Sequence, residues 1–155
     1  MDGSVTTFAV VAGVIGASLN SSIVLILGFA NLFADGFSMS VANYMSTKSR
    51  NEMLKNPEKD ERKTALATFV AFLLAGFIPL ISFVVAAMTK NSWLVANQFK
   101  CAFVLTGLAL IIVGWFKGVV IGKHRVKSAI QTFLIGGVAA LLAFFAGKLI
   151  SRVVG

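Results

Sequence analysis

The amino-acid sequence predicts an all-α membrane protein whose single domain, residues 1–155, contains five transmembrane helices. Hydrophobic residues make up 57% of the chain and charged residues only 13%, too few charges for the surface of a soluble domain of this length. The apolar residues also fall in blocks, each close to the roughly 20 residues needed to cross a bilayer. The predicted spans cover residues 4–19, 22–46, 64–88, 98–117 and 127–150.

A tight turn is expected between the first two spans, within residues 16–22. Without a break, the apolar run over residues 5–44 would form one helix of about 60 Å, roughly twice the hydrocarbon thickness. Asn20, Ser21 and Ser22 offer a turn and a new helix N-cap instead. The first two spans are therefore expected to form a hairpin.

Local signals in the spans predict how the helices bend and pack. Pro79 is expected to kink the third span, which membrane helices tolerate when neighbouring groups cover the freed carbonyl. Small residues recur at the four-residue spacing that allows close helix packing, in the pairs Gly13 with Ala17 and Gly136 with Ala140. We expect both pairs to lie in helix–helix contacts.

The basic residues predict the orientation of the protein in the membrane. Ten of the 14 lysines and arginines lie in the loops after the second and fourth spans, and five spans put these loops on one side. The positive-inside rule then places the N-terminus in the cytoplasm and the C-terminus outside. The net charge of +8 is an orientation signal by this interpretation, and no nucleic-acid partner is expected.

The predicted cytoplasmic loop, residues 47–63, mixes acidic and basic side chains. It is expected to hold two solvated helix ends around a turn at Asn56 and Pro57.

Cys101 is expected to be a buried structural thiol, and His124 a solvated residue beside the membrane. Because no phosphate-binding loop, catalytic triad or histidine-rich cluster is present, the chain is not predicted to be an enzyme.

One helix face of the second span carries oxygen- and sulfur-bearing side chains. These side chains follow one another at four-residue steps: Asn31, Asp35, Met39 and Asn43. We call them the ligand row, and Ser38 lies beside them on the helix. A carboxylate within a bilayer costs a few kcal/mol or more, and such residues usually mark routes for ions or protons. The cost of burying Asp35 therefore favours a functional role for the row.

The side-chain types of the ligand row favour a path for a divalent transition metal. Carboxylate and amide oxygens suit hard divalent cations, and a thioether adds affinity for softer ions while discriminating against magnesium and calcium. Asp35 could also bind a proton when the metal leaves. Taken alone, Met39 is better explained as a packing residue, and Asp35 could instead accept a structural hydrogen bond or pair with a loop lysine.

The chain begins with "DGSVTTFAVVAGVIGAS", continues with "GFANLFADGFSMSVANYMSTKS" and "GFIPLISF", and closes with "KGVVIGKHRVKSAIQTFLIGGVAALLAFFAGKLI". These stretches resemble the vacuolar iron transporter family over nearly the whole membrane part. The resemblance implies a five-span protomer that forms a homodimer, with a metal path between the first two spans of each subunit. It also implies transport of divalent iron or manganese out of the cytoplasm in exchange for protons.

By this resemblance, Asp2 matches the first-span aspartate of the family and Met39 its second-span methionine ligand. Eukaryotic members carry a glutamate where this chain has Asn31, and Asp35 one turn later offers the missing charge. Many members also insert a metal-binding domain after the second span, for which the link here is too short, so a short form is expected. The expected metal ligands are Asp2, Asn31, Asp35 and Met39, with Asp35 and Asp2 also carrying protons and Ser38 and Asn43 lining the path.

The expected function is therefore export of ferrous or manganous ion, with the metal as transported substrate and no permanently bound cofactor. The expected partners are these metal ions, protons, the lipid bilayer and a second copy of the chain. The lean loops favour a prokaryotic inner membrane. Two alternatives stay open: a non-transporting membrane scaffold with the same fold, and a passive cation pore.

Overall fold

The computed structural model describes residues 2–54, 59–89, 91–122 and 124–154. Within these ranges the chain is helical apart from short turns and contains no β-strand, as the composition predicts. The elements are α1 (Asp2–Gly16), α2 (Ser21–Met53), α3 (Glu61–Phe77), the 3-10 turn η1 (Ile78–Leu80), α4 (Ile81–Thr89), α5 (Ser92–Ile121) and α6 (Arg125–Val154).

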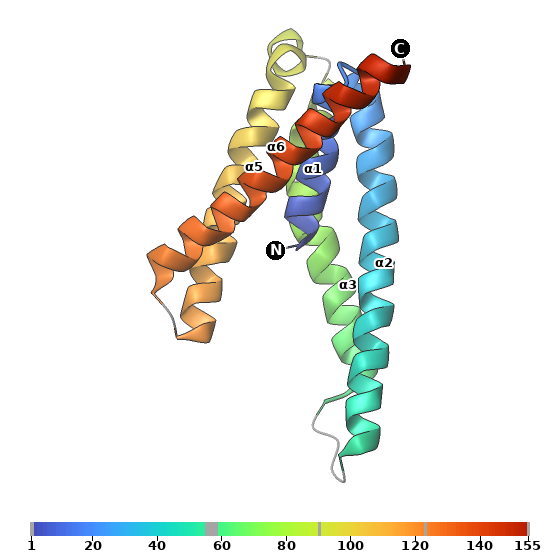
Figure 1. Ribbon diagram of the computed structural model, residues 1–155, viewed down its shortest axis with the longest axis vertical. Helices are drawn as coiled ribbons and strands as arrows, with labels where there is room; N and C mark the ends of the chain where they lie inside the picture. The colour runs from blue at the N-terminus through green and yellow to red at the C-terminus, as the bar shows by residue number, and fades with distance from the viewer. Residues whose placement is uncertain (1, 55–58, 90, 123, 155) are drawn as a thin grey trace.

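The helices run up and down along the long axis of the molecule. The α1–α2 turn, the α4–α5 connection and the C-terminal end of α6 lie at one end, whereas the α2–α3 connection lies at the other (Figure 1). Helix α1 contacts α6 on one side and the α2–α3 pair on the other. Helices α5 and α6 form a hairpin that leans away from α2 and α3 toward the α5–α6 turn (Figure 1). The short helix α1 therefore lies between two long hairpins, which are also connected by contacts of η1 and α4 with α5.

Within the residues that the structure describes, four helical segments are long and apolar enough to cross a membrane: Ser21–Met53, Glu61–Thr89, Ser92–Ile121 and Arg125–Val154. Helix α1 is also apolar, but its 15 residues extend only about 22 Å, less than the roughly 30 Å of a hydrocarbon core. The 33 residues of α2 extend about 50 Å, so this helix continues well beyond such a core. The all-α membrane fold is confirmed to this extent, while the fifth span, the orientation and the dimer stay predictions.

Both predicted breaks in the apolar runs occur where they are expected. Helix α1 ends at Gly16, Ser18 adopts a left-handed conformation with φ of 57°, and α2 begins at Ser21. Asn20 takes the N-cap position of α2, but its side chain accepts no capping hydrogen bond. Farther along, η1 replaces the regular helix at Pro79 because proline donates no backbone hydrogen bond.

The predicted cytoplasmic loop between the second and third spans, expected to hold two helix ends around a turn, consists mostly of helix ends in its described part. Helix α2 continues to Met53, and α3 begins after Asp60, whose carboxylate accepts hydrogen bonds from two backbone N–H groups of the first turn. Asn51 joins the two ends, since its Nδ2 donates to the Lys59 carbonyl at 2.7 Å and to Glu61 Oε2 at 3.1 Å. The predicted turn at Asn56 and Pro57 lies outside the described residues.

Small residues allow α1 and α6 to cross with their backbones in contact, as predicted for Gly13 and Ala17. A Cβ atom at Gly147 would collide with the Gly13 carbonyl oxygen and lie 3.2 Å from the Ala17 backbone nitrogen. Gly136 similarly faces a Leu110 methyl group of α5, and Ala140 is buried in the apolar core. Both predicted pairs therefore lie in helix–helix contacts.

Candidate metal pathway along α2

The ligand row lies at the edge of the interface between α2 and α3. The buried side of α2 consists of small and apolar residues at four-residue steps: Gly28, Leu32, Gly36 and Ser40. The first three members of the row each precede one of these residues and so lie about 100° around the helix from it. Asn31, Asp35 and Asn43 are half-buried, whereas Met39 and the neighbouring Ser38 are exposed. The row thus passes from protein-covered positions to the protomer surface.

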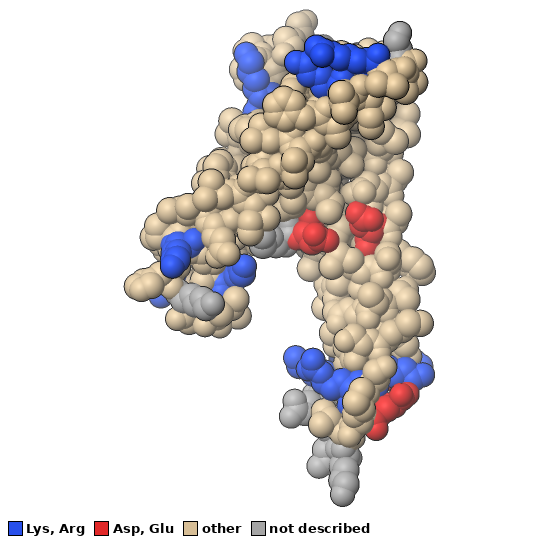
Figure 2. Space-filling model, viewed as in Figure 1, with Lys and Arg blue, Asp and Glu red and all other residues tan. Residues whose placement is uncertain are grey.

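Phe72 of α3 brings the start of α1 and the middle of α2 to the same level. A Cβ atom at Gly3 or at Gly36 would lie 3.3 Å from the same ring atom, Cδ1 of Phe72. Asp2 directly precedes Gly3, and Asp35 directly precedes Gly36. Figure 2 shows acidic atoms at mid-height, near the N-terminal end of α1 and the middle of α2, well apart from those at the lower end of the α2–α3 hairpin. The residues that follow the two predicted carboxylate ligands therefore face one aromatic ring, so Asp2 and Asp35 lie at a similar level along the helices.

The junction of α1, α2 and α3 also contains buried polar atoms without hydrogen-bond partners among the described residues. Two of these atoms are Thr7 Oγ1 and Asn31 Nδ2. A Cβ atom at Gly76 of α3 would lie 3.0 Å from Thr7 Oγ1 and against a methyl group of Leu32, the residue after Asn31. An unpaired buried polar group costs about 1–3 kcal/mol, and functional sites are one explanation for keeping it. These atoms favour a polar route at this junction.

Asn43 is the member of the row that the structure ties to another helix. Its Nδ2 donates a hydrogen bond of 2.5 Å to Thr68 Oγ1 of α3, and this hydroxyl donates to the Thr64 carbonyl at 2.9 Å. Asn43 therefore fixes α2 against α3 below the carboxylates. Its predicted role in lining the path stays a prediction.

A polar cavity of about 290 Å³ lies next to Asn43, between the ends of α2 and α3. Hydroxyl and amide groups line it together with the cations Arg50 and Lys59. Two positive charges disfavour a bare metal ion at this position by Coulomb repulsion. The sequence pattern did not predict this cavity, because it depends on how the two helix ends are aligned.

The charged residues of the described part of the protomer supply at most two ligands at this site. Among the residues that the structure describes, no three histidine, cysteine, aspartate or glutamate side chains lie together in a way that could hold a metal ion. Asp2 and Asp35 provide two carboxylates, and neutral donors would have to complete the ligand set. The 38% exposed fraction of Met39 leaves its thioether accessible to groups outside the protomer.

Cys101 and His124, the two other reactive side chains considered in the sequence analysis, lie away from the ligand row. Cys101 is only half-buried on α5, less than we expected for a structural thiol. His124 is exposed in the α5–α6 turn, as predicted. Neither residue lies on α1 or α2.

The sequence model of a family described as the VIT family matches the chain over residues 1–64 and 55–148. A vacuolar iron transporter of Toxoplasma gondii is 27% identical over 100% of this chain and 73% of the relative. Vacuolar iron transporter 1 of Arabidopsis thaliana is 27% identical over 97% of this chain and 83% of the relative. Vacuolar iron transporter homolog 4 of Arabidopsis thaliana is 29% identical over 93% of this chain and 76% of the relative.

The lengths of these alignments agree with the predicted short form. The alignment with the Toxoplasma gondii protein is 221 positions long, far more than the 155 residues of this chain, so that relative carries additional internal residues. The alignment with homolog 4 is only 157 positions long. The two matched segments of the family model also meet at the α2–α3 connection, where a further domain was expected to be missing.

Proposed function

Because the chain belongs to the VIT family, we propose that it exports divalent iron or manganese from the cytoplasm in exchange for protons. The family and the relatives named above are transporters rather than enzymes, in agreement with the sequence-based prediction. Iron is the metal that the names of these relatives specify. Manganese and the proton exchange are the further steps of the proposal.

One observation carries the assignment of the path: Gly3 and Gly36, the residues after Asp2 and Asp35, both face Phe72, which supports two carboxylates at one level. Within an otherwise apolar region, two carboxylates at one level are costly unless a cation or protons neutralise them. Asp2 and Asp35 would bind the divalent cation, and Asn31 and Met39 would complete its ligand set. The thioether of Met39 would favour ferrous and manganous ions over magnesium.

The same carboxylates provide a physical basis for proton coupling. When a divalent cation leaves, the half-buried Asp35 and the exposed Asp2 keep two negative charges beside an apolar region. Binding of protons from the opposite side would neutralise them and allow the site to return without metal. Each carboxylate would thus alternate between metal and proton, which is the requirement for exchange.

We further propose that a second copy of the chain completes the path. Met39 and Ser38 are exposed on the protomer surface, so groups of a partner subunit could approach them. The proposed orientation follows the positive-inside rule, with the N-terminus in the cytoplasm, and the short connections between helices favour a prokaryotic inner membrane. Transport would then move the metal from the cytoplasm to the outside.

The test is metal flux into proteoliposomes that contain purified protein and a metal-quenched dye, with and without a proton gradient. Gradient-dependent quenching by ferrous or manganous ion is expected for the parent and for Asp60→Asn, a matched change at the start of α3. Asp35→Asn is expected to abolish it. Metal flux that is the same with and without the proton gradient would instead indicate a passive cation pore. The absence of flux of either metal through a folded protein would indicate a non-transporting membrane scaffold.

A further inference from the structure

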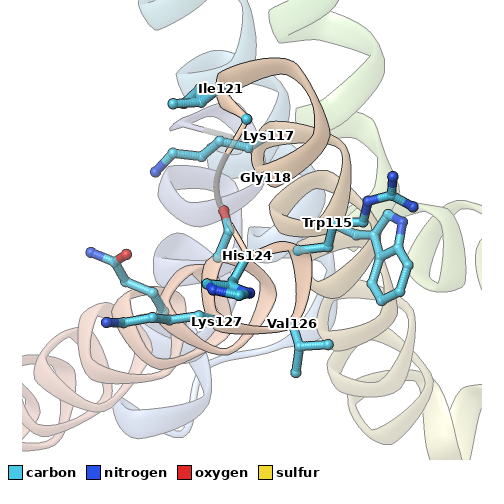
Figure 3. A pocket seen from close by; sticks show the side chains of 11 residues that line it. Trp115, Lys117, Gly118, Ile121, His124, Val126 and Lys127 are labelled. Atoms are coloured by element: carbon cyan, nitrogen blue, oxygen red, sulfur yellow. The ribbon is translucent and has the colours of Figure 1, made fainter.

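A second site lies far from the ligand row, at the turn between α5 and α6. An open cavity of about 1050 Å³ is lined there by side chains of both helices. Its wall combines the cations Lys117, Arg125 and Lys127 with the apolar side chains of Trp115, Ile121 and Val126. Figure 3 shows Lys117 and Lys127 extending to the same side of the turn, with His124 between them and Trp115 on the opposite side.

The charge of this cavity favours an anion. None of its described lining residues is acidic, and none of its three lysine and arginine side chains forms a salt bridge within the described part of the chain. Three cations around one opening attract a phosphate group, and an arginine can bind two of its oxygens at once. A metal ion would be repelled from the same position.

Two hollows continue from the cavity along α6, one lined by apolar side chains alone and the other by apolar side chains together with His124, Lys127 and Gln131. One, of about 260 Å³, lies between α5 and α6 and is lined by apolar side chains that include Trp115 and Phe133. The other, of about 720 Å³, extends along the opposite flank of α6 toward Ile135. Three residues line both hollows: Val126, Ile130 and Leu134. Because they follow at four-residue steps, they form a ridge with one groove on each side.

We propose that this turn binds an anionic phospholipid, with its phosphate at Lys117 and Lys127. Its two acyl chains would lie in the grooves on either side of the Val126–Ile130–Leu134 ridge. Inorganic phosphate would satisfy the cations but leave both grooves unused, whereas a two-chain lipid matches the charge and the apolar surface together. The indole of Trp115 lies where headgroup and chains meet, a position that tryptophan prefers in membranes.

The two tryptophans of the chain allow a direct test in lipid nanodiscs. Trp93→Phe leaves Trp115 as the only reporter, and Trp115→Phe leaves Trp93, at the other end of α5, as the matched control. We expect brominated phosphatidylglycerol to quench Trp115 more than brominated phosphatidylcholine does at the same mole fraction. Trp93 is expected to show no such preference. Equal quenching of Trp115 by the two lipids would overturn the proposal.

Charge variants in the Trp93→Phe background identify the headgroup contacts. Lys117→Gln and Lys127→Gln are each expected to lower the preference for the anionic lipid roughly fivefold, the effect of one cation at a membrane surface. Lys100→Gln, a matched change on α5 away from the cavity, is expected to preserve it. A preference that survives in the Lys117→Gln, Lys127→Gln double variant would refute the assigned contacts.

A competition experiment separates the lipid from free phosphate. A large molar excess of inorganic phosphate, at constant ionic strength, is expected to leave the quenching preference unchanged because the acyl chains contribute to binding. Loss of the preference under these conditions would show a phosphate site instead and would overturn the lipid assignment.

Discussion

Asp35 is the residue whose placement most needs an explanation, because a half-buried carboxylate in an apolar helix is costly. Its neighbours on the buried side of α2, Leu32 and Gly36, provide packing and no charge. The proposed function accounts for the cost, since a bound cation or a proton neutralises the group in each state of the cycle. Each member of the ligand row can then be tested by a substitution that preserves its shape.

Asp35→Asn removes the charge of the side chain and keeps its size. We expect proton-coupled metal flux to be abolished, which requires a fall of at least roughly tenfold, because one charge-assisted ligand contributes about 1.5–3 kcal/mol. The thermal stability should be unchanged or slightly higher, since burying an amide costs less than burying a carboxylate. Flux assays and thermal unfolding in detergent measure the two effects, and parent-like flux would remove Asp35 from the path.

Met39→Leu removes the sulfur and conserves most of the side-chain volume. Ferrous and manganous flux should become more sensitive to competing magnesium, while the rate without competitor changes little. The measurement is metal flux at increasing magnesium concentration. An equal loss of flux with and without magnesium would instead assign Met39 a packing role.

At the scale of elements, the start of α3 and the crossing of α1 with α6 are each fixed by a specific contact. The Asp60 carboxylate accepts the backbone N–H groups of Lys63 and Arg62, and the crossing depends on a glycine of α6. The first contact depends on one capping residue, Asp60, and the second on one glycine, Gly147. They can therefore be disrupted without changing the ligand row.

The cap at Asp60 predicts a pH dependence at the start of α3. The hydrogen bond from the Lys63 backbone N–H, with a second from Arg62 and the charges of both side chains, outweighs desolvation and holds the pKa of Asp60 below 3.8, the ordinary value for aspartate. Because the pKa of Asp60 is lower in the folded state, its carboxylate stabilises the folded protein at pH values above the unfolded-state pKa. This contribution is lost as the pH falls through the folded-state pKa.

We therefore expect the backbone amides of Arg62 and Lys63 to lose protection from hydrogen exchange below about pH 3.8, after correction for intrinsic rates. Asp60→Asn keeps a capping side chain that does not titrate, so its protection should not change over this range. Equal pH dependence in the parent and the variant would contradict a role for the Asp60 carboxylate.

Two glycines of α6 form a matched pair for testing the α1–α6 crossing. Gly147→Ala would place a Cβ atom against the Gly13 carbonyl oxygen, whereas Gly137→Ala would meet no atom within 4 Å. We expect Gly147→Ala to destabilise the protein by about 1–3 kcal/mol through overpacking. Gly137→Ala should be neutral or stabilising by up to about 1 kcal/mol because alanine favours a helix. Thermal unfolding in detergent compares them, and equal effects would argue against the close crossing.

At the scale of the whole molecule, two long hairpins are joined through the short helix α1. Large apolar side chains are exposed along much of α5 and α6, as expected for surfaces that face lipid. The α2–α3 hairpin continues beyond the length of a hydrocarbon core and carries charged groups at its far end (Figure 2). The exposed part of the ligand row is the region that the proposed second copy would cover.

The proposed dimer predicts cross-linking at the ligand row. In a Cys101→Ser background, Ser38→Cys should form a disulfide-linked dimer in membranes, because Ser38 is exposed beside Met39. Val120→Cys, at a strongly exposed position near the end of α5, is the matched control and should remain monomeric. Cross-linking at Val120 but not at Ser38 would place the interface elsewhere.

Much of the fold could be predicted because its signals are local in the sequence. Hydropathy predicted the positions of the long helices. The polar residues around Asn20 predicted the first turn, and Pro79 predicted the break in the third helical segment. The ends of the helices were less predictable. Helix α2 continues to Met53, and near its end Asn51 donates hydrogen bonds to the Lys59 carbonyl and to Glu61, the first residue of α3.

The candidate site was predictable only as a row of residues on one helix. The four-residue spacing of Asn31, Asp35 and Met39 follows from the helical period, so the sequence by itself determined that they share a face. Only the tertiary structure decided that Phe72 contacts both Gly3 and Gly36, and that cations and two grooves converge at the α5–α6 turn. The physical reason is that hydropathy and helical period depend on neighbours along the chain, whereas such contacts depend on which helices pack together and at what height.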